Sequence, residues 1–520
     1  MRGDMSLFRF IKGIMASILA SAVIVFGFGS EVSYADTSGH TAAQAGIEWS
    51  RQYGNNSTAK SVSPTSDGGY IMAGEITEID NSGPYPNSVR KAYLVKTNAA
   101  GELEWEQKVT YGENESDSST AYKAVQTRDG GYIVTGSTDI DRWTYVLLIK
   151  LSPQGEVEWK KAYEGHFFQY GQAVLETEDG GFVTTGVSAG YATGADAYVL
   201  KTDAQGHKLW MKYYHFSGDQ YFSDIIPAQD GGYVAVGNVN IDEYSSGPAD
   251  YSVILKLDEQ GEKVWEEHYK RADGAMRAAS VIAAGGSDQG YLFLQNKWDG
   301  KSTPILTRTD LQGKVLWEKT FDHLSKETSL SQVVRTERGY SLLGGTYTVS
   351  DGPVKRSYQH VILTLDESGS LIDQFTLGEA GSYALGKGIY TQEGAYVLSS
   401  VTGYSSQQSA AITKVQVPKS DSPVSGSFYL DSDEYSISAG TSIDTVAYFK
   451  DTDGVVHNVT KDAVFYSENP EIAEYDQAGN IIGHRAGITY ISAVYQGQTY
   501  RASVQVLRAY VPRGEQTRGE

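Results

Sequence analysis

Asp129-Gly130-Gly131-Tyr132-Ile133-Val134-Thr135-Gly136 is the stretch that decides the fold, because versions of it recur along the chain at intervals of about fifty residues. Close copies begin at Asp67, Asp179 and Asp230. Weaker copies lie at 288–291, 337–340 and 393–396, which makes seven. Glycine supplies the positive φ of a tight hairpin and aspartate caps the turn, so each copy predicts a turn that feeds a strand.

A second repeated phrase, Lys-x-Asp-x-x-Gly-x-x-x-Trp, ends most units with a tryptophan. Its members are Trp49, Trp105, Trp159, Trp210, Trp265 and Trp317. An aromatic residue at a fixed place in every repeat predicts packing between adjacent units rather than a binding row. The sixth unit has Asp373 at this place and Phe375 two residues later, so we expect that unit to pack more loosely.

Each unit contains four short apolar strands, and seven such units predict an all-β, seven-bladed β-propeller over residues 47–417. A solenoid is the competing architecture, but it needs capping repeats. The last unit lacks its fourth strand, and the segment Ile47–Tyr53 is a fourth strand with nothing before it. We therefore predict that Ile47–Tyr53 pairs with Ala410–Val415 and closes the ring.

The repeats resemble the secreted bacterial propellers that are grouped with quinoprotein-like and WD-type repeats. The Trp-ending phrase is similar to the quinoprotein tryptophan-docking motif. Quinoprotein dehydrogenases of that family are eight-bladed rings with a calcium-held cofactor and often a vicinal cysteine pair. Because this chain has seven units and no cysteine, we expect no cofactor and no metal.

Residues 418–426 read as a linker, and the repeat is lost after them. Short strand patterns over 427–508 predict a β-sandwich. Ser467-Glu468-Asn469-Pro470, the Gly-bounded hairpin Gly479–Gly483 and the turn Ala486-Gly487 resemble the bacterial immunoglobulin-like domain, group 2. The resemblance implies a spacer or adhesive module without catalytic residues. Residues 509–520 are expected to be a flexible tail.

The N-terminal segment 1–35 has the pattern of a signal peptide. Basic residues precede the apolar run Ile14–Phe28, and Ser33-Tyr34-Ala35 offers small residues for cleavage. A membrane anchor is the alternative, but fifteen apolar residues are short for a span. We expect an extracellular or cell-wall-associated protein, with no transmembrane segment in the mature chain.

The charge balance and the missing motifs narrow the function. The net charge of −21 argues against nucleic-acid binding. The absence of cysteine excludes disulfides and thiolate sites. Motifs of zinc peptidases, serine hydrolases and nucleotide-binding proteins are missing as well. We expect a monomer that binds an extracellular glycan or protein.

The candidate site lies on the face that carries the variable connections, where aromatic rings and carboxylates suit a sugar. Its predicted residues are Asp141, Trp143, Tyr191, Tyr244, Trp298 and Asp299. Ordinary exposed loops are the competing interpretation. We expect a non-enzymatic binding or adhesion protein; the alternative is a glycosidase or lyase that uses paired loop carboxylates. No residue is predicted to be catalytic.

Overall fold

The computed structural model describes most of the chain from residue 46 to residue 508. The segments left out within that range are 81–86, 113–116, 166–167, 191–193, 217, 241–250, 272–273, 286–288, 325–327, 350–355, 378–381, 404–407, 418–425, 452–453, 462, 468, 477–478 and 496–497. The predicted signal peptide, most of the predicted linker and the predicted tail therefore lie outside the described residues. The described residues form strands and no helix, so none of their elements could cross a membrane as a helix.

Residues 46–416 form antiparallel groups of four strands each, in which consecutive strands are neighbours. The first three groups are β2 (Ser57–Pro64), β3 (Tyr70–Asp80), β4 (Asn87–Thr97) and β5 (Leu103–Val109); β6 (Ser119–Gln126), β7 (Tyr132–Ile140), β8 (Trp143–Leu151) and β9 (Val157–Tyr163); and β10 (Phe168–Glu176), β11 (Phe182–Gly190), β12 (Gly194–Thr202) and β13 (Lys208–Tyr214). A single parallel pair, Phe168 with Thr144, links the second group to the third.

The remaining groups follow the same order. They are β14 (Asp219–Pro227), β15 (Tyr233–Asn240), β16 (Tyr251–Leu257) and β17 (Lys263–Lys270); β18 (Ala275–Ala283), β19 (Tyr291–Trp298), β20 (Ser302–Thr309) and β21 (Val315–Thr320); β22 (Ser329–Arg335), β23 (Gly339–Val349), β24 (Arg356–Asp366) and β25 (Leu371–Leu377); and β26 (Ser382–Tyr390), β27 (Ala395–Thr402) and β28 (Ser409–Gln416) together with β1 (Gly46–Tyr53).

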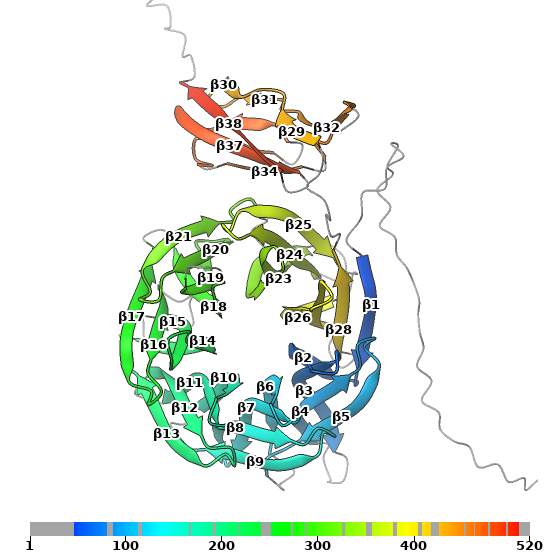
Figure 1. Cartoon of the computed structure of the whole chain (residues 1–520), viewed down its shortest axis with the longest axis vertical. Coiled ribbons are helices and arrows are strands. Elements are labelled where there is room, and N and C mark those ends of the chain that lie inside the picture. Colours follow the sequence, from blue (N-terminus) through cyan, green and yellow to red (C-terminus); the bar gives the residue numbers. More distant parts are fainter. Residues whose placement is uncertain are drawn as a thin grey trace, which may run out of the picture. The chain divides into compact units, whose positions relative to one another are not determined.

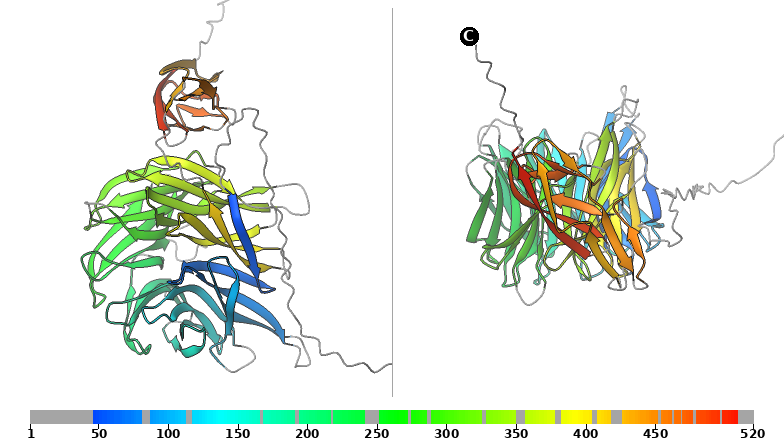
Figure 2. Two further views of the ribbon diagram at one scale, coloured as in Figure 1. Left: turned by 45° about the vertical axis from the view of Figure 1, so that its right-hand side comes forward. Right: turned by 90° about the horizontal axis from the view of Figure 1, so that it is seen from above.

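Successive groups pack against one another and form the ring of a β-propeller-like fold (Figure 1). The strands run between the two faces of this ring, as Figure 2 shows edge-on. The first strand of each group lies toward the centre, so we call β2, β6, β10, β14, β18, β22 and β26 the inner strands. Because the groups are antiparallel meanders, both tight glycine turns of a group lie at one face of the ring and the variable connections at the other.

The predicted closure is confirmed, because β1 pairs antiparallel with β28 from Ile47 opposite Val415 to Tyr53 opposite Ala410. The Tyr53 hydroxyl donates a 2.6 Å hydrogen bond to the Gly101 carbonyl in the first group. The N-terminal strand therefore belongs to the last sheet and also contacts the first, so the two ends of the repeat array hold each other.

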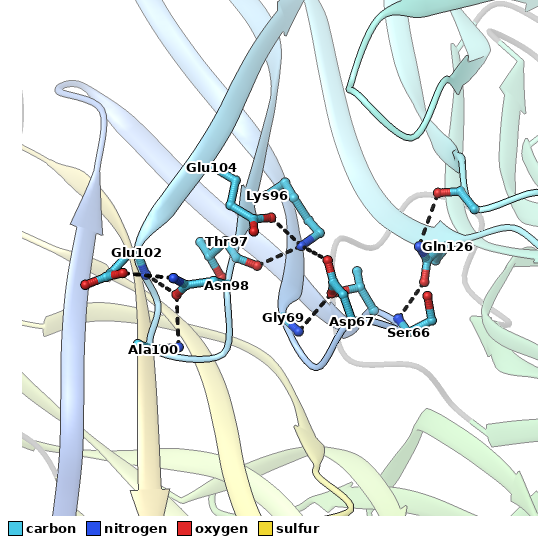
Figure 3. A network of polar contacts seen from close by, with 12 residues as sticks. Ser66, Asp67, Gly69, Lys96, Thr97, Asn98, Ala100, Glu102, Glu104 and Gln126 are labelled. Atoms are coloured by element: carbon cyan, nitrogen blue, oxygen red, sulfur yellow. Dashed lines mark hydrogen bonds and ion pairs between the residues drawn. The ribbon is translucent and has the colours of Figure 1, made fainter.

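A buried lysine joins the first tight turn of the first group to its last strand, β5 (Figure 3). Lys96 is 2% exposed, and its Nζ lies 2.8 Å from Asp67 and 2.6 Å from Glu104. Asp67 also accepts the N–H of Gly69 at 3.0 Å. Burial opposes ionisation of Asp67, but the hydrogen bonds from Lys96, Thr65 and Gly69 outweigh it and lower its pKa to about 2. The turn aspartate is thus an ion-pair partner as well as the predicted cap.

The same lysine recurs in other groups. The pairs are Lys150 with Asp129, Lys201 with Asp179, Lys256 with Asp230 and Lys414 with Glu393. Lys414 lies in addition 3.4 Å from Glu48 of β1, as Lys96 lies beside Glu104. The N-terminal strand therefore completes the charge network of the last sheet.

The tryptophans pack on the next group, as predicted. A Cβ built on Gly101 would lie 2.6 Å from the Trp49 ring, and Trp105, Trp159, Trp210, Trp265 and Trp317 cover the corresponding turn glycines Gly155, Gly206, Gly261, Gly313 and Gly369 in the same manner. These glycines have φ between 72° and 83°. The close approach of an indole ring requires a residue without a side chain at this turn.

The ring closure explains why the sixth group has no tryptophan. Asp373 stands opposite Thr364, the register that Trp317 takes opposite Arg308. The next sheet is completed by β1, so its third and fourth strands are not joined by a turn that could offer a glycine. Phe375 packs instead on a buried cluster that contains Tyr396. The expected looseness of this unit stays a prediction.

Burial raises the pKa of the Asp373 carboxyl to about 6, and nearby Arg338 only partly opposes this. Since the folded pKa lies above the ordinary value, the unfolded chain loses this proton first. This group's contribution therefore falls as the pH rises from about 4 to about 6, by at most about 3 kcal/mol. Asp373→Asn is expected to remove that fall and to make the protein more stable at pH 7. Urea unfolding at several pH values measures both effects. Asp141→Asn, at an exposed turn, is the control; equal pH profiles for wild type and Asp373→Asn would contradict the assignment.

The C-terminal region is also all-β and has a core of its own. Its strands are β29 (Gly426–Leu430), β30 (Glu434–Ser438), β31 (Ser442–Ile443), β32 (Ala447–Asp451), β33 (Val456–Asn458), β34 (Val464–Ser467), β35 (Ala473–Tyr475), β36 (Ile481–Gly483), β37 (Gly487–Tyr495) and β38 (Gln498–Leu507). They form sheets of order β29-β32-β33, β30-β38-β37-β34 and β31-β36-β35 around buried residues such as Phe449, Ile491 and Val504.

Candidate functional site

Four of the six predicted site residues are described, and they lie in two groups of strands that do not pack on each other. Asp141 and Trp143 belong to the second group of strands, whereas Trp298 and Asp299 belong to the fifth. The second group packs on the first and third groups, and the fifth on the fourth and sixth. Tyr191 and Tyr244 lie outside the described residues.

Asp141 is a hairpin residue rather than part of a long loop. Asp141 and Arg142 have φ of 48° and 83° and connect the paired residues Ile140 and Trp143. Two positive φ values in a two-residue connection define a type I′ turn, for which aspartate is a favoured residue. β7 and β8 therefore continue almost to each other, and their connection is a two-residue turn. Trp143 packs edge-on against Phe168 of β10, with centroids 6.2 Å apart.

Trp298 keeps the accessibility that a binding residue requires. It ends β19 and is 45% exposed. Burial opposes ionisation of the neighbouring Asp299, but the hydrogen bond from Lys297 and the N–H of Lys301 outweigh it and lower the pKa of this carboxyl. The carboxylate lies 2.9 Å from the Lys297 ammonium. Asp299 is thus an ionised, paired group at the edge of the ring.

The inner strands provide a second set of half-exposed polar side chains. Each inner strand shifts register against its neighbour at a β-bulge, where one or two residues face no partner. The bulge side chains include Lys60, Tyr122, Gln172, Ser223, Ser331 and Lys387, which are all half-exposed. Their neighbours at the bulge, such as Ala121 and Ala173, are buried. We call the half-exposed residues of the inner strands the inner wall.

One ion pair connects two inner strands that are not neighbours. Lys123 of β6 lies 3.4 Å from the Asp224 carboxylate of β14, although β10 comes between them in the ring. Asp224 is 2% exposed and also accepts hydrogen bonds from the Ser280 hydroxyl and the Val281 N–H, both at 3.3 Å. Ser280 is contacted in turn by Gln332 of β22 at 3.0 Å. This network ties four inner strands together.

Electrostatics hold Asp224 in its charged form. Burial opposes ionisation, but the charges of Lys123 and Lys387 and two backbone N–H groups outweigh it and lower the pKa of the carboxyl. Lys387 is affected in the opposite sense. Burial lowers the pKa of its ammonium, Asp224 opposes this, and Lys123 adds to the lowering. Two lysines therefore share one carboxylate at the centre of the ring.

Tyrosines stand beside these charges. Tyr122 and Tyr170, on the successive inner strands β6 and β10, contact edge to face with centroids 6.4 Å apart. Tyr221 follows on β14 in the neighbourhood of Arg277. Burial raises the pKa of Tyr122 and Tyr221, so their hydroxyls stay protonated and can donate hydrogen bonds. Half-exposed aromatic rings with nearby polar groups suit a ligand that has an apolar face and hydroxyls.

Glu75 continues the polar surface next to the inner wall. It lies 3.4 Å from Lys60 and 3.8 Å from Arg90, and it accepts the Thr120 hydroxyl at 2.9 Å. Arg90 also reaches Asp139 at 3.2 Å. The carboxylates at this side of the ring are therefore paired with cations. Within the described ranges, no group of three or more His, Cys, Asp or Glu side chains is arranged to hold a metal ion.

The sequence predicts the site in the connections and not on the inner strands. A usable signal exists in the strand that precedes each turn phrase. The bulge position of this strand holds a lysine or tyrosine in one unit and a small residue in another, whereas the position before it stays apolar or glycine. Variation at one position of a repeat, next to a position that stays apolar, marks side chains that do not serve the packing.

A separate concavity of about 610 Å³ lies in the C-terminal region. Its lining includes Tyr429 and Tyr448, whose rings are 5.7 Å apart, and the acids Asp431 and Asp433. Asp431 already accepts the Tyr435 hydroxyl at 2.6 Å, and Asp433 accepts the Tyr500 hydroxyl. These acids position neighbouring strands, so we place the candidate site in the ring.

No protein-family model and no curated protein matches the chain. Solved structures that resemble it include a GH43 endo-arabinanase from Bacillus licheniformis (13% identity, TM-score 0.29, 48% of this chain and 94% of that one). Others are Sqt1 from Chaetomium thermophilum (11%, 0.40, 89% and 100%) and a glucose dehydrogenase (9%, 0.35, 57% and 96%). With TM-scores of at most 0.40 among these three, we argue neither fold nor function from them, and the fold rests on the strand pairings themselves.

Proposed function

We propose that this chain is an exported binding protein that recognises an extracellular glycan with the centre of a seven-bladed β-propeller. In this proposal residues 1–35 are a signal peptide, and the C-terminal region is an immunoglobulin-like spacer or attachment module. The protein acts outside the cell or on its wall. The four-strand groups and the closure by β1 support the seven blades, and the separate core of the C-terminal sheets supports a second module.

One observation carries the choice of ligand. Inner strands of three successive groups bring Tyr122, Tyr170 and Tyr221 to the inner wall, next to charged and amide side chains. Sugar rings offer C–H faces that stack on aromatic rings and hydroxyls that need hydrogen-bond partners. A ring that gathers such groups from distant parts of the chain is a preorganised binding surface.

The state of the carboxylates favours binding over hydrolysis. A glycosidase needs a carboxylic acid with a raised pKa as its proton donor. The pKa of Asp224 is lowered instead, and Glu75 and Asp139 both lie beside Arg90. These paired acids hold the inner wall together, which supports a binding protein over the glycosidase or lyase.

A glycan array probed with the full chain tests this proposal. We expect retention of a restricted set of polysaccharide fragments, and about fivefold weaker binding for Tyr170→Ala, since an aromatic contact contributes about 1 kcal/mol. Tyr490→Ala, at a 40% exposed position of the C-terminal region, is the matched control and should bind as the wild type does. Absence of binding to every glycan would contradict the sugar proposal. Cleavage of the glycans to shorter products would favour the enzyme.

A further inference from the structure

The inner strands are positively charged in a strongly acidic protein. They carry Lys60, Lys123, Arg277, Arg335 and Lys387 against Glu176, Asp219 and Asp224. The whole chain has 43 Lys and Arg against 64 Asp and Glu. Positive charges that lie together on the inner strands produce a local field, and this field attracts anions although the whole protein is acidic.

Within the described ranges, two of these cations form no direct ion pair with a carboxylate. Lys60 lies beside Glu75, Lys123 beside Asp224, and Arg335 beside Glu367. Among the residues that the structure describes, neither Arg277 nor Lys387 forms an ion pair with a carboxylate. Lys387 is partly exposed and Arg277 is exposed.

Asp224 cannot neutralise Lys387 fully because its oxygens are already engaged. One oxygen lies 3.4 Å from Lys123 and 3.1 Å from the Ile225 N–H. The other accepts the Ser280 hydroxyl and the Val281 N–H. Partial burial of Lys387 adds a desolvation cost to its charge, which Asp224 offsets only in part. An anion at this position would neutralise the positive charge that the single Asp224 carboxylate leaves on the two lysines.

We propose that the inner wall binds an oxyanion of its ligand between Lys387 and Lys123, so that the ligand is an acidic saccharide rather than a neutral one. This inference rests on the proposed glycan binding and specifies its chemical class. Carboxylate is the group of a uronic acid, and phosphate or sulfate esters offer the same oxyanion chemistry. Tyr122 and Tyr170 lie on the neighbouring inner strands and contact the sugar ring that bears the charge. Arg277, near Tyr221, contacts a second acidic unit.

Calorimetric titration of the full chain tests the site with four probes: trigalacturonate, a sulfated trisaccharide, inorganic phosphate and neutral maltotriose. We expect binding of trigalacturonate that weakens as salt increases, and no comparable binding of maltotriose. Lys387→Met should weaken the binding by about tenfold to hundredfold, as expected for loss of a charged hydrogen-bond partner. Lys387→Arg should retain it. Lys314→Met removes an exposed lysine at an outer turn and is the matched control.

The thermal midpoint of Lys387→Met separates binding from folding. Because the partly buried ammonium carries a desolvation cost, this variant should melt at the wild-type temperature or above it. Selective binding of the sulfated sugar or of phosphate, lost in Lys387→Met, would support the site and reassign its oxyanion. Equal binding of maltotriose and trigalacturonate, unchanged in Lys387→Met, would overturn the inference but leave glycan binding intact. Silence of all saccharides here and on the array would end both.

Discussion

Exchange of Trp49 for alanine is expected to lower the free energy of unfolding by about 3–5 kcal/mol, the range for a buried tryptophan. Trp49 is 8% exposed and packs on Tyr70, with centroids 6.0 Å apart, as well as on Gly101. It lies on β1, which no tight turn joins to its neighbour β28. Loss of this side chain therefore weakens the contact of the closing strand with the first group and opens the ring.

Denaturant unfolding of the full chain measures this effect as a shift of the midpoint. The matched control is Trp317→Ala. Trp317 covers Gly369 as Trp49 covers Gly101, but it is only half-buried and its strand β21 is joined to β20 by a tight turn. We expect the control to lose clearly less stability. Equal losses in both variants would show that the closing strand has no special importance.

The second large effect is expected for Gly186→Ala, with a loss of about 3 kcal/mol, in the upper range for overpacking. Gly186 stands opposite Gly171 at the bulge of β10. A Cβ at this position would overlap the Tyr170 carbonyl oxygen and lie 3.2 Å from the Gln172 nitrogen. Since these atoms belong to the backbone, the inner strand itself must move, and glycan binding through Tyr170 should weaken as well.

Gly180→Ala is the control for this prediction. Gly180 has a φ of 80°, but a Cβ there meets nothing within 4 Å. The control should lose only the roughly 1–2 kcal/mol of a left-handed alanine and bind normally. Urea unfolding and glycan binding of the two variants provide the comparison. The fifth unit has Gln295 at the equivalent place, so its inner strand accommodates a side chain there. A Gly186→Ala protein as stable as the wild type would mean that β10 adapts in the same way, and it would contradict the prediction.

The sequence predicted the units and their closure because these depend on short-range chemistry. A tight turn needs glycine with a positive φ next to a capping aspartate, and both are read directly in Asp129-Gly130-Gly131. The lone strand Ile47–Tyr53 could be assigned to Ala410–Val415 because one unit lacked a strand. The extent of the strands was not predictable in the same way. The Asp141-Arg142 turn contains no glycine, so its local sequence does not mark it as a tight hairpin.

The candidate site shows where the sequence alone stops. The sequence predicts its aromatic rings and carboxylates in the connections. In the structure Trp143 packs on Phe168 of β10, and Asp141 forms a two-residue turn. Lys123, Asp224 and Lys387 are separated by more than a hundred residues along the chain and meet only because the closed ring brings its inner strands around one axis. Repetition therefore determined the architecture, since each unit repeats the same local chemistry. The tertiary structure decided which of the varying residues lie together, because proximity across the ring leaves no periodic trace in the sequence.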